Sequence, residues 1–287
     1  MFNYLGTSYK FFPTVGIKLT GCCRFQCPFC CEPDKDQKVY PIGDFQKIIN
    51  ILHSAGTQRL CLTGGDPLLY PEIEKIIFHS KSLGIKTILL TADGELLKQN
   101  IQKVKDVDAV RLSLHEIGIG NDDIVNHKGA FAALVEAASA LREVNIPIQV
   151  TTVVTPQNKD KLKSIAEWCI QNQVEKYYLF GLMKSGKGCK FISGTGSLTI
   201  SELEEVHSVL LGQYNDRLDI KLYKYESYAE CILVYGDGRI VIDPYPDKDT
   251  HQKEIGNLFT NTIDEIVSIF SQDKYNCSCY KEHLKQV

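Results

Sequence analysis

Three cysteines carry the clearest chemical signal in this chain of 287 residues. Cys23, Cys27 and Cys30 have the spacing C-x3-C-x2-C and follow an apolar run at residues 14–19, so we expect them on a short loop that leaves a strand. Thiolates on such a loop can converge on one inorganic centre. Three is one fewer than a closed four-iron cluster needs. One iron would stay open to a ligand from outside the protein, and an open coordination position is typical of a reactive site.

Two other interpretations of these thiols remain open. Cys31 could act as the fourth ligand of a zinc site, although no second C-x2-C or Cys/His unit follows at a suitable distance. The thiols could also pack together as small apolar groups without any metal. A zinc-binding or redox-sensing regulatory protein is therefore the alternative of a different functional class.

Composition limits the remaining choices. The net charge of −3 gives no basic surface for nucleic acid. The sequence has no run of about 18 apolar residues and no charged N-terminal region followed by an apolar core, so neither a membrane span nor a signal peptide is expected. Eleven cysteines are an odd number, and five of them fall between Cys22 and Cys31. This pattern favours reduced thiols and a cytoplasmic location.

The elements that would position the cysteines follow an alternating pattern of strands and helices. Apolar runs rich in Val, Ile and Leu predict strands at 14–19, 59–63, 86–91, 109–114, 146–154 and 176–182. Helical spacing predicts helices at 44–52, 71–83, 129–144 and 159–171, the first with Asp44 as N-cap. The fold class is therefore α/β, a partial (β/α)6 TIM-like barrel whose post-strand loops lie on one rim.

The pattern changes near residue 190. Residues 189–197 are rich in turn formers and predict a linker or mobile loop. A helix at 199–211 with a Thr199/Glu202 capping box, a hairpin at 231–242 and a helix at 262–270 follow. We therefore divide the chain into an N-terminal segment (1–13), a core barrel (14–190) and a small α+β C-terminal extension (191–287).

The cysteine spacing resembles the signature of the radical S-adenosylmethionine (SAM) superfamily, in which an aromatic residue precedes the third cysteine, as Phe29 does here. The resemblance implies a [4Fe-4S] cluster on Cys23, Cys27 and Cys30. It also implies that SAM chelates the open iron through its amino and carboxylate groups. An electron from a donor such as flavodoxin or ferredoxin would then cleave SAM to a 5'-deoxyadenosyl radical.

Further motifs resemble the SAM-binding segments of that superfamily, in the expected order. Gly64, Gly65, Asp66 and Pro67 resemble its GGEP motif, which binds the SAM amino group, although these residues alone would also suit an ordinary strand-to-helix turn. Ser113 resembles a strand serine that contacts SAM, and its alternative is a hydroxyl bonded to backbone.

Other candidates stand at the ends of later strands. Asn158 resembles a residue facing adenine or ribose, with a helix N-cap as the alternative role. His115 and Glu116 lie just past the fourth strand and are the candidate catalytic residues for substrate contact or proton transfer. Three lysines could bind an anionic substrate or could simply be solvated: Lys184, Lys187 and Lys190. Residues 91–94, Thr-Ala-Asp-Gly, depart from the Thr-Asn-Gly common in the superfamily.

The C-terminal extension resembles a degenerate twitch or SPASM module, the modules that carry auxiliary clusters. With only Cys231, Cys277 and Cys279 available there, such a cluster would need an unusual ligand, and the sequence does not favour it. The short N-terminal segment points to a small-molecule substrate (a sugar, nucleoside or amino-acid-derived metabolite). The alternative within the superfamily is a maturase that modifies a peptide or protein.

Overall fold

A single curved sheet organises the protein. The computed structural model describes residues 2–4, 7–31, 38–223, 232–242 and 253–272. The sheet has ten strands in the order β12-β11-β10-β3-β4-β5-β6-β7-β8-β9. Its parallel part contains β3 (Thr14–Thr20), β4 (Arg59–Gly64), β5 (Lys86–Thr91), β6 (Ala109–Ser113), β7 (Ile148–Val153), β8 (Lys176–Phe180) and β9 (Asp219–Leu222). Since β12 and β9 are its two edges, the sheet is not closed, and the prediction of a partial barrel is confirmed.

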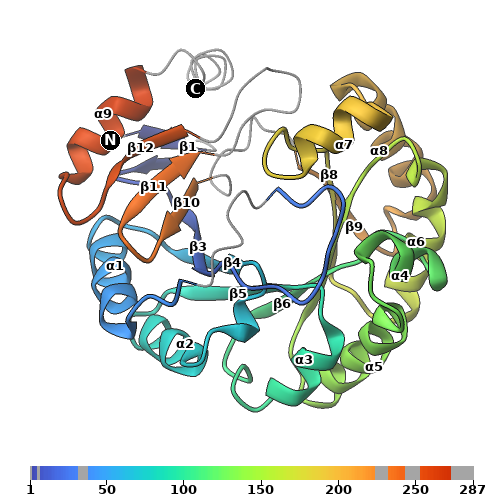
Figure 1. The fold of residues 1–287 in the computed structure, drawn as a ribbon, viewed down its shortest axis with the longest axis horizontal. Coiled ribbons are helices and arrows are strands. Elements are labelled where there is room, and N and C mark those ends of the chain that lie inside the picture. The colour runs from blue at the N-terminus through green and yellow to red at the C-terminus, as the bar shows by residue number, and fades with distance from the viewer. Residues whose placement is uncertain (1, 5–6, 32–37, 224–231, 243–252, 273–287) are drawn as a thin grey trace.

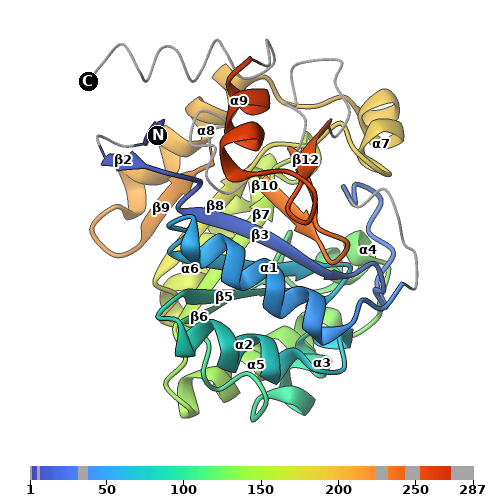
Figure 2. The same cartoon turned by 90° about the vertical axis from the view of Figure 1, so that its left-hand side faces the viewer.

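Helices cover the outer face of this sheet. Figure 1 shows them following one another around the outside of the strands, and Figure 2 shows α1 and α2 on the side of β3. Right-handed crossovers place successive helices on one face. The helices in this layer are α1 (Ile42–Ser54), α2 (Ile73–Ser82), α3 (Gly94–Asn100), α4 (Ile119–Val125), α5 (Ala130–Glu143), α6 (Leu162–Gln171) and α8 (Ile200–Tyr214).

The core explains why the strands read as apolar runs. All seven residues of β3 are buried, as expected for a parallel strand covered on both faces. On α1 the residues Phe45, Ile48, Ile49 and Leu52 are buried at helical spacing and pack into the same core cluster. In the described part of the chain, no helix has both the length and the apolarity that a membrane crossing requires.

The structure corrects several details of the prediction. Residues 189–197 do not form a loop, because α7 (Gly188–Thr195) occupies most of them. The helix expected from Asp44 starts at Ile42 with Pro41 at its N-cap, and α3 and α4 were not anticipated. The capping box of Thr199 and Glu202 at the start of α8 is confirmed.

The C-terminal hairpin extends the barrel sheet. It consists of β10 (Ile232–Tyr235) and β11 (Arg239–Ile242), and β12 (Lys253–Asn257) and α9 (Ile263–Gln272) follow. β10 pairs in parallel with β3, with Leu233 opposite Gly16. A Cβ on Gly16 would lie 2.5 Å from Leu233 Cδ2, so the glycine permits this pairing. A separate short hairpin is formed by β1 (Phe2–Tyr4) and β2 (Thr7–Tyr9).

Candidate active site

The three signature cysteines lie in the loop that follows the carboxyl end of β3. Cys23, Cys27 and Cys30 are all half-buried. The Phe25 amide donates a hydrogen bond to Cys23 Sγ at 3.4 Å. The described residues include no set of three His, Cys, Asp or Glu side chains close enough to hold a single metal ion. Three thiols on one loop, with an amide aimed at one sulfur, fit the donor set of a cluster with one open iron.

Neighbouring elements hold this loop in place. The Phe25 side chain is buried beside Val125 of α4, and the Gln26 amide donates to the Val125 carbonyl at 3.0 Å. From the other side of the rim, the Lys187 amide donates to the Cys30 carbonyl at 2.9 Å. Backbone hydrogen bonds in the middle of the motif and at its third cysteine therefore fix its path.

Gly64 ends β4, and Gly65 follows it beside the start of the cysteine loop. The Gly65 amide donates to the Thr20 carbonyl, and the Asp66 amide donates to the Cys22 carbonyl, both at 2.7 Å. A Cβ on Gly64 would lie 2.2 Å from the Thr20 carbonyl oxygen, and one on Gly65 would lie 2.0 Å from that of Cys22. Packing against the cysteine loop is thus one reason for both glycines.

Asp66 begins a chain of polar contacts across the rim. Its Oδ1 accepts from the Leu68 amide at 3.0 Å, and its Oδ2 accepts from the Thr91 hydroxyl at 2.6 Å. The Thr91 oxygen accepts from the Asp93 amide at 3.0 Å, and Asp93 pairs with Arg24 of the cysteine loop. Burial raises the pKa of Asp66 to about 7. The carboxylate therefore serves the internal structure of the rim, joining β4 to β5.

Phe29 lies between two rings at the top of the barrel. It packs edge-on against His115 at 5.0 Å and against Phe191 of α7 at 5.6 Å between ring centroids. His115 is buried, and its Nδ1 accepts from the Val153 amide at 3.3 Å. Burial lowers the pKa of His115 to about 4, so the imidazole is neutral at pH 7. Ser113, the last residue of β6, is half-buried.

Glu116 and the loop lysines occupy the outer rim. Glu116 Oε1 accepts a hydrogen bond from the Lys161 ammonium, and its side chain is 18% exposed. Lys187 is exposed and donates to Gln26 Oε1 at 2.9 Å, while Lys190 is exposed on α7. Lys184 is half-buried.

Asn158 joins the tips of β6 and β7. Its Oδ1 accepts from the Thr155 amide at 2.8 Å, and its Nδ2 donates to the His115 and Val153 carbonyls, both at 3.0 Å. The residue stands at the N-cap position of a short 3-10 helix, but its side chain makes no capping hydrogen bond there. Pro67 is buried at the start of another 3-10 helix, Pro67–Leu69, which Asp66 caps.

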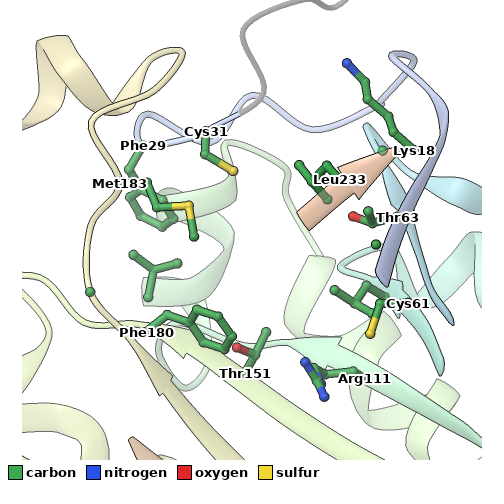
Figure 3. A pocket seen from close by; sticks show the side chains of 15 residues that line it. Lys18, Phe29, Cys31, Cys61, Thr63, Arg111, Thr151, Phe180, Met183 and Leu233 are labelled. Carbon is green, nitrogen blue, oxygen red and sulfur yellow. The ribbon is translucent and has the colours of Figure 1, made fainter. Parts of the chain in front are cut away.

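A cavity of about 230 Å3 runs from the cysteine loop into the barrel (Figure 3). Its described lining includes Phe29 and Gly64 of the predicted set. The remaining lining residues are Gly16, Lys18, Cys31, Cys61, Thr63, Leu90, Arg111, Thr151, Val153, Phe180, Gly181, Met183 and Leu233. The space lies beneath the loop that carries the signature cysteines, which makes it the candidate site for SAM and substrate.

Sequence reasoning missed most of the described cavity wall, including the cationic residues Lys18 and Arg111. Lys18 and Arg111 are 3% and 2% exposed and point inward from β3 and β6. A charged residue inside an otherwise apolar strand was the available signal, because such a residue is rarely buried without a reason.

Comparison with known sequences identifies a family. The sequence model of the family described as "Radical SAM superfamily" matches residues 17–169, which is more than half of the chain. A GTP 3',8-cyclase of Aquifex aeolicus is 29% identical over 163 residues, 53% of this chain and 51% of that protein. A PqqA peptide cyclase of Bradyrhizobium diazoefficiens is 22% identical over 166 residues, 56% of this chain and 44% of that protein. The matches to these relatives span about half of their length.

Solved structures share the fold. SuiB of Streptococcus suis bound to S-adenosylmethionine gives a TM-score of 0.71 at 14% identity, covering 94% of this chain and 68% of that one. SuiB bound to its precursor peptide SuiA also gives 0.71, at 16% identity and with 94% and 67% coverage. Methylornithine synthase gives 0.60 at 15% identity, with 99% and 83% coverage. At these identities the likeness concerns the fold alone.

Proposed function

Because the chain belongs to the radical SAM superfamily, we propose that this enzyme holds a [4Fe-4S] cluster on Cys23, Cys27 and Cys30 and acts on a small molecule bound in the barrel cavity. The observation that carries the proposal is the continuity of that cavity with the cysteine loop, since Phe29 and Cys31 of the loop line it together with Arg111 deep in β6. The substrate class is a sugar, nucleoside or amino-acid-derived metabolite.

When bound, the cluster would supply the electron that cleaves SAM reductively to a 5'-deoxyadenosyl radical. The chain's own residues would orient the reactants. Backbone carbonyls near Gly64 and Gly65 can accept from the SAM ammonium group, and the Ser113 hydroxyl can bond its ribose or carboxylate. Phe29 and the apolar wall of the cavity exclude water from a radical that water and other small molecules would quench.

The two catalytic candidates take different roles in this proposal. Glu116, which is paired with Lys161, is the candidate for proton exchange with the substrate, although it is not part of the described cavity wall. His115 is neutral and buried, and its Nδ1 is occupied by the Val153 amide. It therefore positions Phe29 from below.

Two observations bear on the substrate. One relative is named as a GTP cyclase, which favours a small molecule. The cavity also reaches strand residues inside the barrel, such as Arg111 of β6. The name of the PqqA peptide cyclase and the precursor peptide bound to SuiB support peptide modification as the second candidate. Cys231, Cys277 and Cys279, the possible auxiliary ligands, lie outside the described residues.

Anaerobic reconstitution tests the proposal. The wild-type chain should bind four irons and four labile sulfides, and with dithionite or reduced flavodoxin it should convert SAM to 5'-deoxyadenosine. Single Cys23→Ala, Cys27→Ala and Cys30→Ala variants should lose both properties, whereas Cys31→Ala should keep the iron. One zinc per chain without iron would instead favour the regulatory alternative. Mass analysis after incubation with candidate metabolites and candidate peptides separates the two substrate classes.

A further inference from the structure

We infer that residues 184–191, called the rim segment below, form the surface on which an acidic one-electron carrier protein docks to reduce the enzyme. The inference rests on the proposed function, because only a site that holds a cluster needs such a partner. The carrier gives up one electron there and the cluster gains it, and no bond forms or breaks in this step. A flavodoxin or a ferredoxin has this chemistry, since each is small and carries a negatively charged surface.

The rim segment is attached directly to the cysteine loop. The Lys187 amide donates to the Cys30 carbonyl, and the Lys187 ammonium donates to Gln26 Oε1, both at 2.9 Å. At the end of the segment, Phe191 packs edge-on against Phe29, the residue before the third signature cysteine. Figures 1 and 2 both show α7, which starts within the segment, beside the loop that follows β3. A partner bound to the rim segment therefore lies next to the proposed cluster ligands.

The cysteine loop itself reaches the surface of the protein. Its exposed residues include Gln26, Pro28 and Cys31, whereas the side chains of Phe25 and Phe29 are buried. The three signature cysteines between these residues are half-buried. Electron transfer requires a close approach of donor and acceptor. A carrier that arrives from solvent at this face meets the loop that bears the cluster ligands.

Charge distinguishes the rim segment from the opposite side of the loop. The stretch 181–201 contains three lysines and no Asp or Glu, although the whole chain has a net charge of −3. Lys187 and Lys190 are exposed, and among the described residues neither is paired with a carboxylate. On the opposite side, Arg24 is already paired with Asp93 and Glu95. Positive charge is therefore available to a partner on the rim segment.

An acidic protein fits these lysines better than a small anionic substrate does. Lys187 and Lys190 are not part of the described cavity wall, and their side chains are exposed to solvent. Water and salt screen the attraction of an exposed ammonium for a small ion. Several such groups on one surface can still steer a large surface of opposite charge into place. Electron-transfer complexes typically have small, weak interfaces, and charge complementarity speeds their formation.

Direct binding tests the inference, because it does not depend on turnover. The reconstituted full-length protein is titrated with a flavodoxin and, separately, with a ferredoxin, and complex formation is followed by calorimetry at about 0.05 M salt. We expect at least one of the two carriers to bind. Raising the salt to about 0.5 M should weaken that binding, since screening reduces the attraction between the charges. The double variant Lys187→Glu/Lys190→Glu should bind about tenfold more weakly, which is roughly 1.4 kcal/mol.

Matched variants separate docking from damage to the cluster site. Lys86→Glu reverses an exposed lysine at the start of β5, at the end of the barrel opposite the cysteine loop, and should leave carrier binding unchanged. Lys190→Glu alone should also weaken binding. It decides the question if the double variant loses iron, because the Lys190 side chain forms no hydrogen bond to the described residues.

A second reductant separates this inference from the proposed function. With dithionite, which needs no docking surface, the lysine variants should form 5'-deoxyadenosine at the wild-type rate. The inference is overturned if neither carrier binds the wild type, or if the lysine variants bind the carrier as tightly as Lys86→Glu does. Failure of the wild type to form 5'-deoxyadenosine with dithionite would count against the proposed function instead.

Discussion

Arg24 and Asp93 form a two-pronged ion pair between the cysteine loop and the start of α3. Arg24 Nε and Nη2 each lie 2.6 Å from a different oxygen of Asp93. The same carboxylate caps α3 by accepting from the Leu96 amide at 3.0 Å. Arg24 directly follows Cys23, so this pair fixes the position of the first signature thiol relative to β5 and α3.

Arg24→Ala should therefore loosen the cluster site. We expect iron to be lost to a chelator several-fold faster than from the wild type, and the free energy of unfolding to fall by about 1–2 kcal/mol, because a bidentate charged bond disappears. Arg24→Lys should be intermediate, since an ammonium cannot match both oxygens. Lys81→Met, which breaks an exposed pair with Asp106, is the control. Equal iron-release rates in Arg24→Ala and in this control would contradict the role of the pair.

Gly65→Ala should disrupt the same loop from its other side. The added Cβ would lie 2.0 Å from the Cys22 carbonyl oxygen, which is too close for any real contact. We expect a loss of about 1–3 kcal/mol in the free energy of unfolding and poor iron incorporation after reconstitution. Gly43→Ala on α1 is the matched control, because no atom lies within 4 Å of its Cβ, and it should be neutral or stabilising by up to about 1 kcal/mol. Normal iron content in Gly65→Ala would contradict this account.

The strands and the cysteine loop could be predicted from sequence because both are local signals. β3 is a continuous apolar run, and the cysteine spacing lies within eight residues directly after it. The pairing of β10 with β3 could not be predicted, since it joins residues more than two hundred positions apart, with Leu233 opposite Gly16. α7 was missed because its sequence, Gly-Cys-Lys-Phe-Ile-Ser-Gly-Thr, contains two glycines and two β-branched residues, so tertiary contacts decide its conformation.

In the candidate site, too, the residues with local sequence signals could be predicted and the others could not. Cys23, Phe29 and Gly64 were predicted from the order and spacing of motifs, and in the structure Phe29 and Gly64 both line the cavity. The sequence did not predict that Arg111 and Lys18 line the cavity. Alternation along a strand separates its two faces, but it does not show which face of a strand covered on both sides lines a cavity.

Asp66 and His115 should give opposing pH dependences of stability. Burial raises the pKa of Asp66 from 3.8 to about 7, so the native state holds the proton more tightly than the unfolded chain. Its contribution to stability is fully present below about pH 4 and is lost as the pH rises toward 7. Burial lowers the pKa of His115 from 6.5 to about 4, so its contribution is present above about pH 6.5 and is lost as the pH falls toward 4.

Urea unfolding of the cluster-free chain between pH 4.5 and 7.5 can separate the two groups. In Asp66→Asn the free energy of unfolding should rise more steeply with pH than in the wild type, because only the His115 effect remains. In His115→Gln it should fall with pH over the same range. The pKa differences correspond to upper limits of roughly 4 kcal/mol for Asp66 and roughly 3 kcal/mol for His115. Parallel pH curves for the wild type and both variants would show that neither group titrates as described.

Asn158 offers the sharpest choice between two roles for one predicted residue. If its side chain holds the strand tips, as its three hydrogen bonds indicate, Asn158→Ala leaves the His115 and Val153 carbonyls and the Thr155 amide without their partner. The cluster-free, SAM-free chain should then lose about 3 kcal/mol of unfolding free energy. Asn100→Ala, which removes one bond to the Leu96 carbonyl, should cost about 1 kcal/mol or less. If the side chain instead contacts SAM, Asn158→Ala would weaken SAM binding while leaving the stability of the SAM-free chain unchanged. Measuring both quantities on the same variant distinguishes the two roles, and we expect the loss of stability.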